Sequence, residues 1–318
     1  MFPQLVAGPI VRYLDVEAQL EKREHSLPMC VAGVRCFSAG LAKKVLLGNT
    51  VGMLWERIAA LPESSRSVLC AWGGIVCFSL QIYFDFSGYS DMAIGLGRIF
   101  GFRLPENFNY PYVSQSATEF WRRWHITLST FFREYVYIPL GGNRKGKVRT
   151  YLNLLVVWLL TGLWHGAGWN FILWGLYWFF VLCAEKLFFA QILEKLPRAV
   201  RHAYALFAIA FSWLIFAFDG SDATLTFSAG VLYLKNMLGL SGQTFVSASD
   251  VTSFLRAIPF FAVAAFACTP TAKKIFYAKY TGRAVHEGAL SLLCVGGVIL
   301  CVAFIASSSY NPFLYFRF

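Results

Sequence analysis

Long apolar runs separated by short polar segments make up most of this chain. Residues 151–164 and 171–189 are two such runs, and a short polar tip lies between them. Each run is long enough for a helix, so the pair predicts a helical hairpin in a membrane. Lysines and arginines lie just outside both ends of the hairpin, at 144–149 and 186–201. Because cytoplasmic loops of membrane proteins are rich in these residues, both ends are predicted to face the cytoplasm.

The remaining apolar runs predict further membrane-spanning helices, at residues 68–86, 199–218, 251–268 and 290–306. The loops alternate between basic and non-basic, which predicts that 273–283 lies in the cytoplasm and 219–222 outside. No internal repeat or low-complexity segment is found in the chain. The sequence therefore predicts an all-α, polytopic integral membrane protein with additional interfacial or re-entrant helices, formed by one domain over residues 1–318.

The composition agrees with this class. Hydrophobic residues make up 57% of the chain and charged residues 14%, well below the roughly 25% charged of a soluble domain. The net charge of +11 arises from short clusters between apolar runs, which favours membrane lipids with anionic headgroups over nucleic acid as the partner. The eight cysteines form no C-x-x-C pair and no zinc-ligand spacing, so they are predicted to be buried thiols without a metal.

His165 lies at the tip of the predicted hairpin. At about 1.5 Å per residue, residues 151–164 place it roughly 21 Å along the helix, within a ~30 Å hydrocarbon core. An ionisable group at this depth indicates a functional site, because burying it costs free energy that an apolar residue would not cost. The alternative is a structural histidine that bonds to a neighbouring helix.

A second histidine, His125, belongs to a segment that is too polar to span the membrane. Ser116 and Glu119 have the spacing of a capping box at the start of a helix. That helix is predicted to continue without a break to Tyr135, with an aromatic stripe on one side and His125 at the edge of the stripe. It is predicted to lie in the membrane interface, where a simple membrane anchor is the alternative function.

The predicted span 68–86 ends in an unusually polar cluster, which contains Asp85 and Asp91. These carboxylates are predicted either to cap the helix at the membrane surface or to line a cavity at headgroup depth.

Familiar nucleophile motifs such as G-x-S-x-G and S-x-x-K are missing from the sequence. The two histidines remain as candidates for chemistry. An imidazole in a low-dielectric site stays neutral, so it can remove a proton from a hydroxyl that attacks an activated acyl group. The residue spacing alone does not indicate the substrate.

Three motifs carry a resemblance to a known family: FWRRWHITLS at 120–129, YIPLGGNR at 137–144 and LWHGAGWN at 163–170. Together they resemble the membrane-bound O-acyltransferase family, and most closely its bacterial branch that O-acetylates alginate and other cell-envelope polymers. Residues 2–10, 81–91 and 311–318 are also similar to that branch, so the resemblance extends from end to end. Further membrane helices precede the opening motif in the family, and we therefore expect that this chain lacks an N-terminal part.

The resemblance implies that His165 is the catalytic histidine and that His125 is the second family histidine, both facing a channel. It implies acetyl-CoA as a cytoplasmic donor, no bound cofactor, and an acceptor outside the cytoplasm that is a polysaccharide such as alginate or a partner periplasmic acetyltransferase. The expected location is the bacterial inner membrane. Candidate substrate-binding residues from the matching motifs are Arg122, Arg123, Trp124, Trp164, Asn170 and Asp85.

Alternatives from other classes stay open at this point. Relatives that transfer D-alanine share the two histidines, although the 137–144 motif favours the acetylating branch. A transporter would show paired broken helices in repeated halves, which the sequence lacks. A membrane scaffold for a soluble enzyme would tolerate the loss of both histidines.

Overall fold

The computed structural model describes residues 8–220, 225–274 and 284–307. Within these ranges every regular element is helical, which confirms the predicted all-α class. Most of the opening motif, the acidic residue Asp222, the basic residues Lys279 and Arg283, and the closing motif 311–318 lie outside the described residues.

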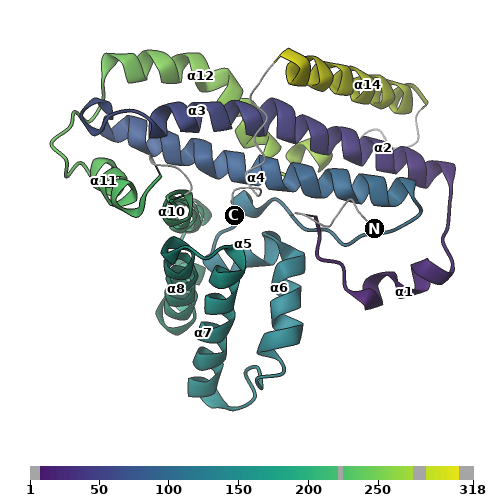
Figure 1. The fold of residues 1–318 in the computed structure, drawn as a ribbon, viewed down its shortest axis with the longest axis horizontal. Coiled ribbons are helices and arrows are strands. Elements are labelled where there is room, and N and C mark those ends of the chain that lie inside the picture. Colours follow the sequence, from purple (N-terminus) through teal and green to yellow (C-terminus); the bar gives the residue numbers. More distant parts are fainter. Residues whose placement is uncertain (1–7, 221–224, 275–283, 308–318) are drawn as a thin grey trace.

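The longest helix is α4 (Val68–Ile99), with 32 residues or a length of ~48 Å. It lies along the long axis of the molecule, with α2 (Leu27–Ala42) and α3 (Asn49–Ala59) beside it (Figure 1). A π-helical turn, η1 (Lys43–Gly48), joins α2 to α3. The other short elements of this half are α1 (Tyr13–Glu21) and η2 (Glu63–Ser65).

Glycines allow α2 and α4 to pack closely. A Cβ atom on Gly33 would lie 2.6 Å from the carbonyl oxygen of Gly95, and a Cβ on Gly95 would lie 2.6 Å from the carbonyl oxygen of Gly33. Gly40 faces Gly88 in the same way, so the two helices run antiparallel with their backbones in contact. A side chain at any of these positions would force the helices apart.

The expectation that this span ends near residue 86, with the acids at its end, was wrong. α4 continues without a break to Ile99, and both acids lie inside it. Each is paired with a lysine of η1: Lys44 lies 2.6 Å from Asp85, and Lys43 lies 2.5 Å from Asp91. The helix can continue because a neighbouring element neutralises the carboxylates, so they do not have to reach the membrane surface.

The predicted hairpin is confirmed as α7 (Gly146–His165) and α8 (Trp169–Ala184). Gly162 lies against the backbone of Phe171 and Ile172 in α8, and Gly175 lies against the backbone of Trp158 in α7. The two helices therefore approach closely at these points. The loop before the hairpin carries η3 (Pro111–Val113), α5 (Ala117–Arg123), α6 (Ile126–Phe132) and η4 (Arg133–Tyr137).

Five helical segments in the described chain are long and apolar enough to cross a membrane. They are α4, the continuous segment Trp169–Lys195 made of α8, η5 (Glu185–Phe189) and α9 (Ala190–Lys195), α10 (Arg198–Ala217), α12 (Ala248–Ala267) and residues Val285–Ser307 of α14 (Ala284–Ser307). α7 is not among them, although it was predicted as one arm of a membrane hairpin. The shorter helix α11 (Phe227–Met237) lies between α10 and α12 in the chain. The protein is therefore a multi-pass membrane protein.

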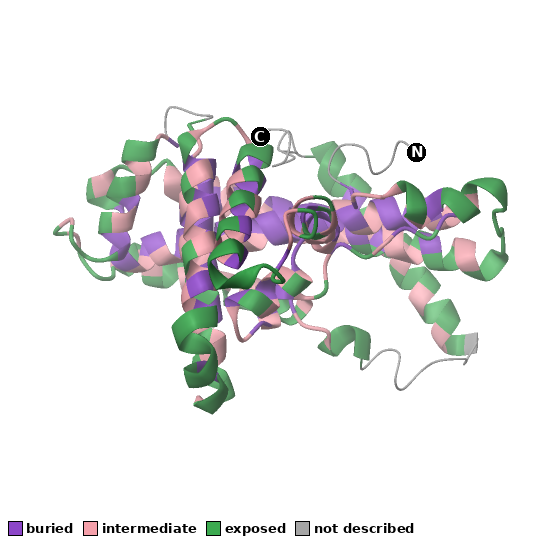
Figure 2. Cartoon of the chain, turned by 90° about the horizontal axis from the view of Figure 1, so that it is seen from below, coloured by how far each residue is buried: buried purple, intermediate pink, exposed green. Residues whose placement is uncertain are grey.

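An aromatic core joins α5, α8 and α10. Trp174, Trp178 and Trp213 are almost completely buried, and the indole N–H groups of Trp174 and Trp178 both donate to the Ser212 hydroxyl at 3.0 Å. Figure 2 shows the buried residues along α4 and on the inner sides of the helices that cross it. This core contacts the segment after α5, which carries His125, and the end of α7, which carries His165.

Candidate functional site

His125 lies at a break between two short helices. α5 ends at Arg123, Trp124 is extended, and His125 adopts a left-handed backbone with φ of 42° before α6 begins. The predicted unbroken helix was therefore wrong. A left-handed conformation is unfavourable for a residue with a Cβ atom, and it persists where the surrounding structure imposes it. Trp124 imposes it here, because its ring is 2% exposed and packs 4.8 Å from the ring of Trp213.

The predicted capping box is only partly formed. The Ser116 hydroxyl accepts from the Glu119 backbone N–H at 3.0 Å, as predicted. The Glu119 carboxylate accepts from the backbone of Gln115, one residue before the expected position.

A side-chain network fixes the ring of His125. Its Nδ1 lies 2.9 Å from Oδ1 of Asn107, which also accepts from the Thr127 hydroxyl at 2.9 Å. The amide nitrogen of Asn107 donates to the Ser90 hydroxyl at 3.0 Å, so the amide oxygen faces the histidine. Because an amide oxygen only accepts, Nδ1 of His125 carries the proton and Nε2 carries the lone pair. Nε2 is buried and has no hydrogen-bond partner among the described residues.

His165 is the last residue of α7 and is 6% exposed. Its Nδ1 donates to the backbone carbonyl of Thr161, one turn earlier in the same helix, at 2.7 Å. Since a carbonyl cannot donate, Nε2 of His165 again carries the lone pair. The ring is held edge-on by Trp174 of α8 at 4.8 Å and by Phe216 of α10 at 5.6 Å. The Nδ1 hydrogen bond of His165 is therefore made within its own helix and not to a neighbouring helix.

Trp164 brings the two histidines into one cluster. Its ring lies 5.8 Å from the ring of His125 and 4.8 Å from the ring of His165. Trp164 itself is 49% exposed, so a molecule that contacts its ring would also be close to both imidazoles. Two buried bases from distant parts of the chain thus share one aromatic neighbour.

The predicted substrate-binding residues of the 120–129 motif occupy different environments. Arg122 is exposed. Arg123 pairs with Glu119 at 2.9 Å and donates to the backbone carbonyl of Asn109 at 3.1 Å. Trp124 belongs to the aromatic core described above. Their part in substrate binding stays a prediction.

Asp85 and Asn170 lie apart from the ring contacts of the histidines. Asp85 is 2% exposed and is paired with Lys44, whereas the next residue of α4, Phe86, contacts His125 at 4.8 Å. Asn170 is in the first turn of α8, and its Nδ2 is buried without a hydrogen-bond partner among the described residues. Asn170 therefore has donor capacity left for a ligand, while the charge of Asp85 is already neutralised by a lysine.

The comparison with known proteins identifies the family. The model of the membrane-bound O-acyltransferase family matches residues 1–228, which include both histidines. The chain belongs to this family. It is 45% identical over 222 residues to the probable alginate O-acetylase AlgI of Azotobacter vinelandii, which covers 70% of this chain and 44% of the relative. It is 37% identical over 332 residues to the same enzyme of Pseudomonas putida, which covers all of this chain and 67% of the relative.

A further relative of this chain has a different named activity. The peptidoglycan O-acetyltransferase of Helicobacter pylori is 34% identical over 343 residues, which covers all of this chain and 63% of the relative. The chain thus spans between 44% and 67% of the length of these curated relatives. The resemblance seen in the motifs is confirmed.

The sequence did not indicate that Asn107, Thr127 and Ser90 hold His125 in place. Asn107 lies in an irregular stretch between α4 and η3 with no helical periodicity, so no pattern marked it. Its only signal was its polar character close to an apolar span. In the described part of the chain, no group of three or more histidine, cysteine, aspartate or glutamate side chains could hold a metal ion.

Proposed function

We propose that this protein transfers an acetyl group from a cytoplasmic thioester donor such as acetyl-CoA to an extracytoplasmic polysaccharide such as alginate, directly or through a partner acetyltransferase, in the bacterial inner membrane. The observation that carries the proposal is the pair of buried histidines around Trp164. Each donates its Nδ1 proton to a protein acceptor and keeps the Nε2 lone pair for another molecule.

His165 is proposed as the general base. Its Nε2 removes the proton of the acceptor hydroxyl while the hydroxyl oxygen forms a bond to the acetyl carbonyl carbon. The carbon–sulfur bond of the thioester then breaks, and the imidazolium returns the proton to the leaving thiolate. Burial favours this cycle, because a desolvated imidazole is neutral and ready to accept a proton.

His125 is proposed to position the acceptor. With the proton on Nδ1, its Nε2 can only accept a hydrogen bond, so it can hold a substrate hydroxyl but cannot donate to a developing oxyanion. The strained backbone and the Asn107 network keep this nitrogen in one direction. The two histidines would then act on one reaction from two sides of Trp164.

The choice of acetyl and of a polysaccharide acceptor is supported by the named relatives. The O-acetylases of Pseudomonas putida and Helicobacter pylori match along the whole of this chain. Transfer of a D-alanyl group would use the same histidine chemistry. Hydrolysis of the polymer esters distinguishes the two donors, because it releases acetate in one case and D-alanine in the other. Alginate and peptidoglycan are the acceptors to examine first.

The test measures ester-linked acetyl on the cell polymer together with the membrane abundance of each variant, in the bacterium that carries this gene. His165→Ala is expected to lower acetylation by about 10²- to 10⁴-fold, the usual contribution of general-base catalysis. His165→Gln keeps much of the size but cannot take a proton, so it is expected to be nearly as inactive. The matched control is His25→Gln, because His25 is an exposed histidine outside the cluster.

His125→Ala is expected to leave more activity than His165→Ala, because it removes positioning and not the base. The double variant is expected to be hardly worse than His165→Ala alone, since groups that act as a unit are strongly non-additive. Normal acetylation by a well-expressed His165→Ala protein would end the enzyme proposal and leave the scaffold alternative. Release of D-alanine in place of acetate on hydrolysis of the polymer would leave the proposed roles of the histidines unchanged but would overturn acetyl as the transferred group.

A further inference from the structure

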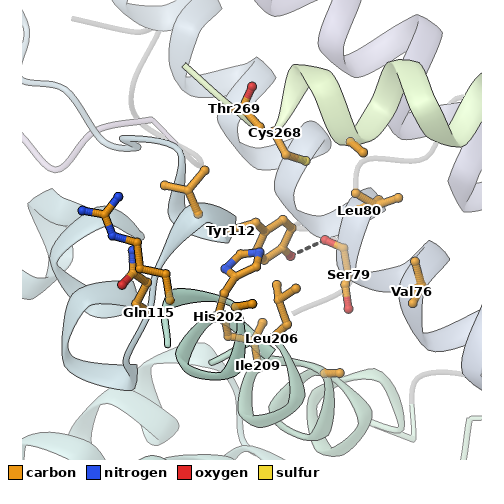
Figure 3. A pocket seen from close by; sticks show the side chains of 15 residues that line it. Val76, Ser79, Leu80, Tyr112, Gln115, His202, Leu206, Ile209, Cys268 and Thr269 are labelled. Atoms are coloured by element: carbon orange, nitrogen blue, oxygen red, sulfur yellow. Dashed lines mark hydrogen bonds between the residues drawn. The ribbon is translucent and has the colours of Figure 1, made fainter. Parts of the chain in front are cut away.

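A cavity of about 660 Å³ lies between α4, the η3 segment, the first half of α10 and the end of α12 (Figure 3). Its volume is within the range of ligand-binding pockets in proteins. The lining residues include Val76 and Leu80 of α4 and Leu206, Ile209 and Ala210 of α10, so most of its wall is apolar.

The cavity is separate from the histidine cluster. Tyr112 forms part of its wall: its hydroxyl donates to the backbone carbonyl of Ser79 and accepts from the Trp213 indole at 3.1 Å. The Tyr112 ring also stacks on Trp124 at 6.3 Å, which lies on the side toward His125. Neither His125 nor His165 lines the cavity. A hydrogen-bonded aromatic layer therefore lies between this space and the proposed acyl-transfer site.

One face of α10 gives the cavity a polar end and an apolar end. Arg198 and His202 line it in the first turns of the helix, and Leu206 and Ala210 follow at the same helical spacing. Arg198 and Ala210 are about 18 Å apart along the helix. Figure 3 shows Gln115 and His202 toward one side of the cavity and the apolar residues of α4 toward the other. This arrangement matches an elongated amphiphile and not a compact ion.

The polar end favours an anion. No aspartate or glutamate lines the cavity in the part of the chain that the structure describes, and Glu119, which bonds the Gln115 backbone, is already paired with Arg123. The imidazole of His202 donates from Nδ1 to the backbone carbonyl of Ser114 at 3.0 Å, so in the imidazolium form its second N–H, on Nε2, is left to donate to an anion. No side chain caps the N-terminus of α10, so the positive end of the helix dipole adds to the charge of Arg198.

We propose that this cavity binds an anionic phospholipid, with its phosphate at Arg198 and His202 and one acyl chain along Leu206, Ile209 and Ala210. The proposal does not rest on acyl transfer, because the histidine cluster does not line the cavity. The bound lipid would connect the start of α10 to the end of α12. The α12 helix is otherwise little buried, since only 6% of its most apolar stretch is buried in the protein.

The test uses the full chain in detergent and measures lipid binding by native mass spectrometry and by the rise in Tm on adding lipid. The probes are phosphatidylglycerol, zwitterionic phosphatidylcholine and inorganic phosphate. Phosphatidylglycerol is expected to bind and to raise the Tm, whereas the other two are expected to have little effect. Equal binding of phosphatidylcholine would overturn the anionic headgroup, and an equal effect of inorganic phosphate would overturn the lipid.

Variants at both ends of the cavity complete the test. Arg198→Gln combined with His202→Gln is expected to weaken phosphatidylglycerol binding about tenfold or more, because it removes charge-assisted hydrogen bonds. Ala210→Phe is expected to block the acyl chain while the cationic end stays intact. Arg144→Gln removes an exposed charge outside the cavity and is the matched control. Unchanged binding in the Arg198 and His202 double variant, which alters only the polar end, would refute the proposal even if Ala210→Phe failed to fold.

Discussion

Replacing Asp85 by asparagine is expected to destabilise the protein far more than the same change at Asp91. Both acids belong to α4, and both pair with neighbouring lysines of η1, Lys44 and Lys43 respectively. The pairs differ in burial. The side chains of Lys44 and Asp85 are 10% and 3% exposed, whereas those of Lys43 and Asp91 are 25% and 29% exposed. The comparison thus holds the chemistry constant and varies the surroundings.

The magnitudes follow from burial. Asp85→Asn removes the carboxylate that pairs with the buried ammonium group of Lys44, which also donates to the neutral amide oxygen of Asn49 at 3.0 Å. Removing one partner of a buried ion pair costs about 3 to 5 kcal/mol. The Lys43–Asp91 pair reaches the surface, where an ion pair contributes about 0 to 1 kcal/mol, so Asp91→Asn is expected to cost no more than that.

The assay is the free energy of unfolding in mixed micelles, titrated with a denaturing detergent and followed by circular dichroism. A double variant, Lys44→Met with Asp85→Leu, removes both buried charges and is expected to recover most of the loss, because apolar replacement of a buried pair is often neutral or stabilising. Equal losses for Asp85→Asn and Asp91→Asn would refute the argument from burial. A double variant as unstable as Asp85→Asn would show that the loss does not come from an uncompensated charge.

Three further outcomes are expected. Asn107→Ala removes the acceptor that orients His125 and should raise the activation free energy by about 1 to 3 kcal/mol, which lowers the acetylation rate about tenfold to a hundredfold. Asn107→Asp keeps an acceptor oxygen and should restore much of the rate, so equal rates for the two variants would contradict the positioning role. Gly95→Ala should destabilise the α2–α4 contact by about 1 to 3 kcal/mol, whereas Gly288→Ala, where nothing lies within 4 Å, should be neutral or slightly stabilising in the same unfolding assay. Ser212→Ala leaves two buried indole N–H groups without their acceptor and should cost about 1 to 3 kcal/mol for each, which a fall in Tm would report.

The helices of this protein could be predicted where one local signal defined them. α10, α12 and α14 follow from apolar runs of membrane-spanning length. The α7–α8 hairpin follows from two apolar runs around a short tip, although only the second of them is long and apolar enough to cross a membrane. The length of α4 could not be predicted in the same way. Charged residues after an apolar run normally indicate that the chain leaves the membrane, but here the compensating lysines lie in another element, far away in the sequence. A local pattern contains no information about that pairing.

The same limit applies at the site. The motifs located both histidines, because each lies in a short sequence with a strong family resemblance. The geometry that leaves a lone pair on each Nε2 was not visible, since it depends on a carbonyl one turn away for His165 and on the irregular residue Asn107 for His125. The aromatic periodicity around His125 even predicted a continuous helix, which would have turned its ring along the interface. Tertiary packing of Trp124 breaks that helix and buries the imidazole, so the local rule fails at the residue that we propose to hold the substrate hydroxyl.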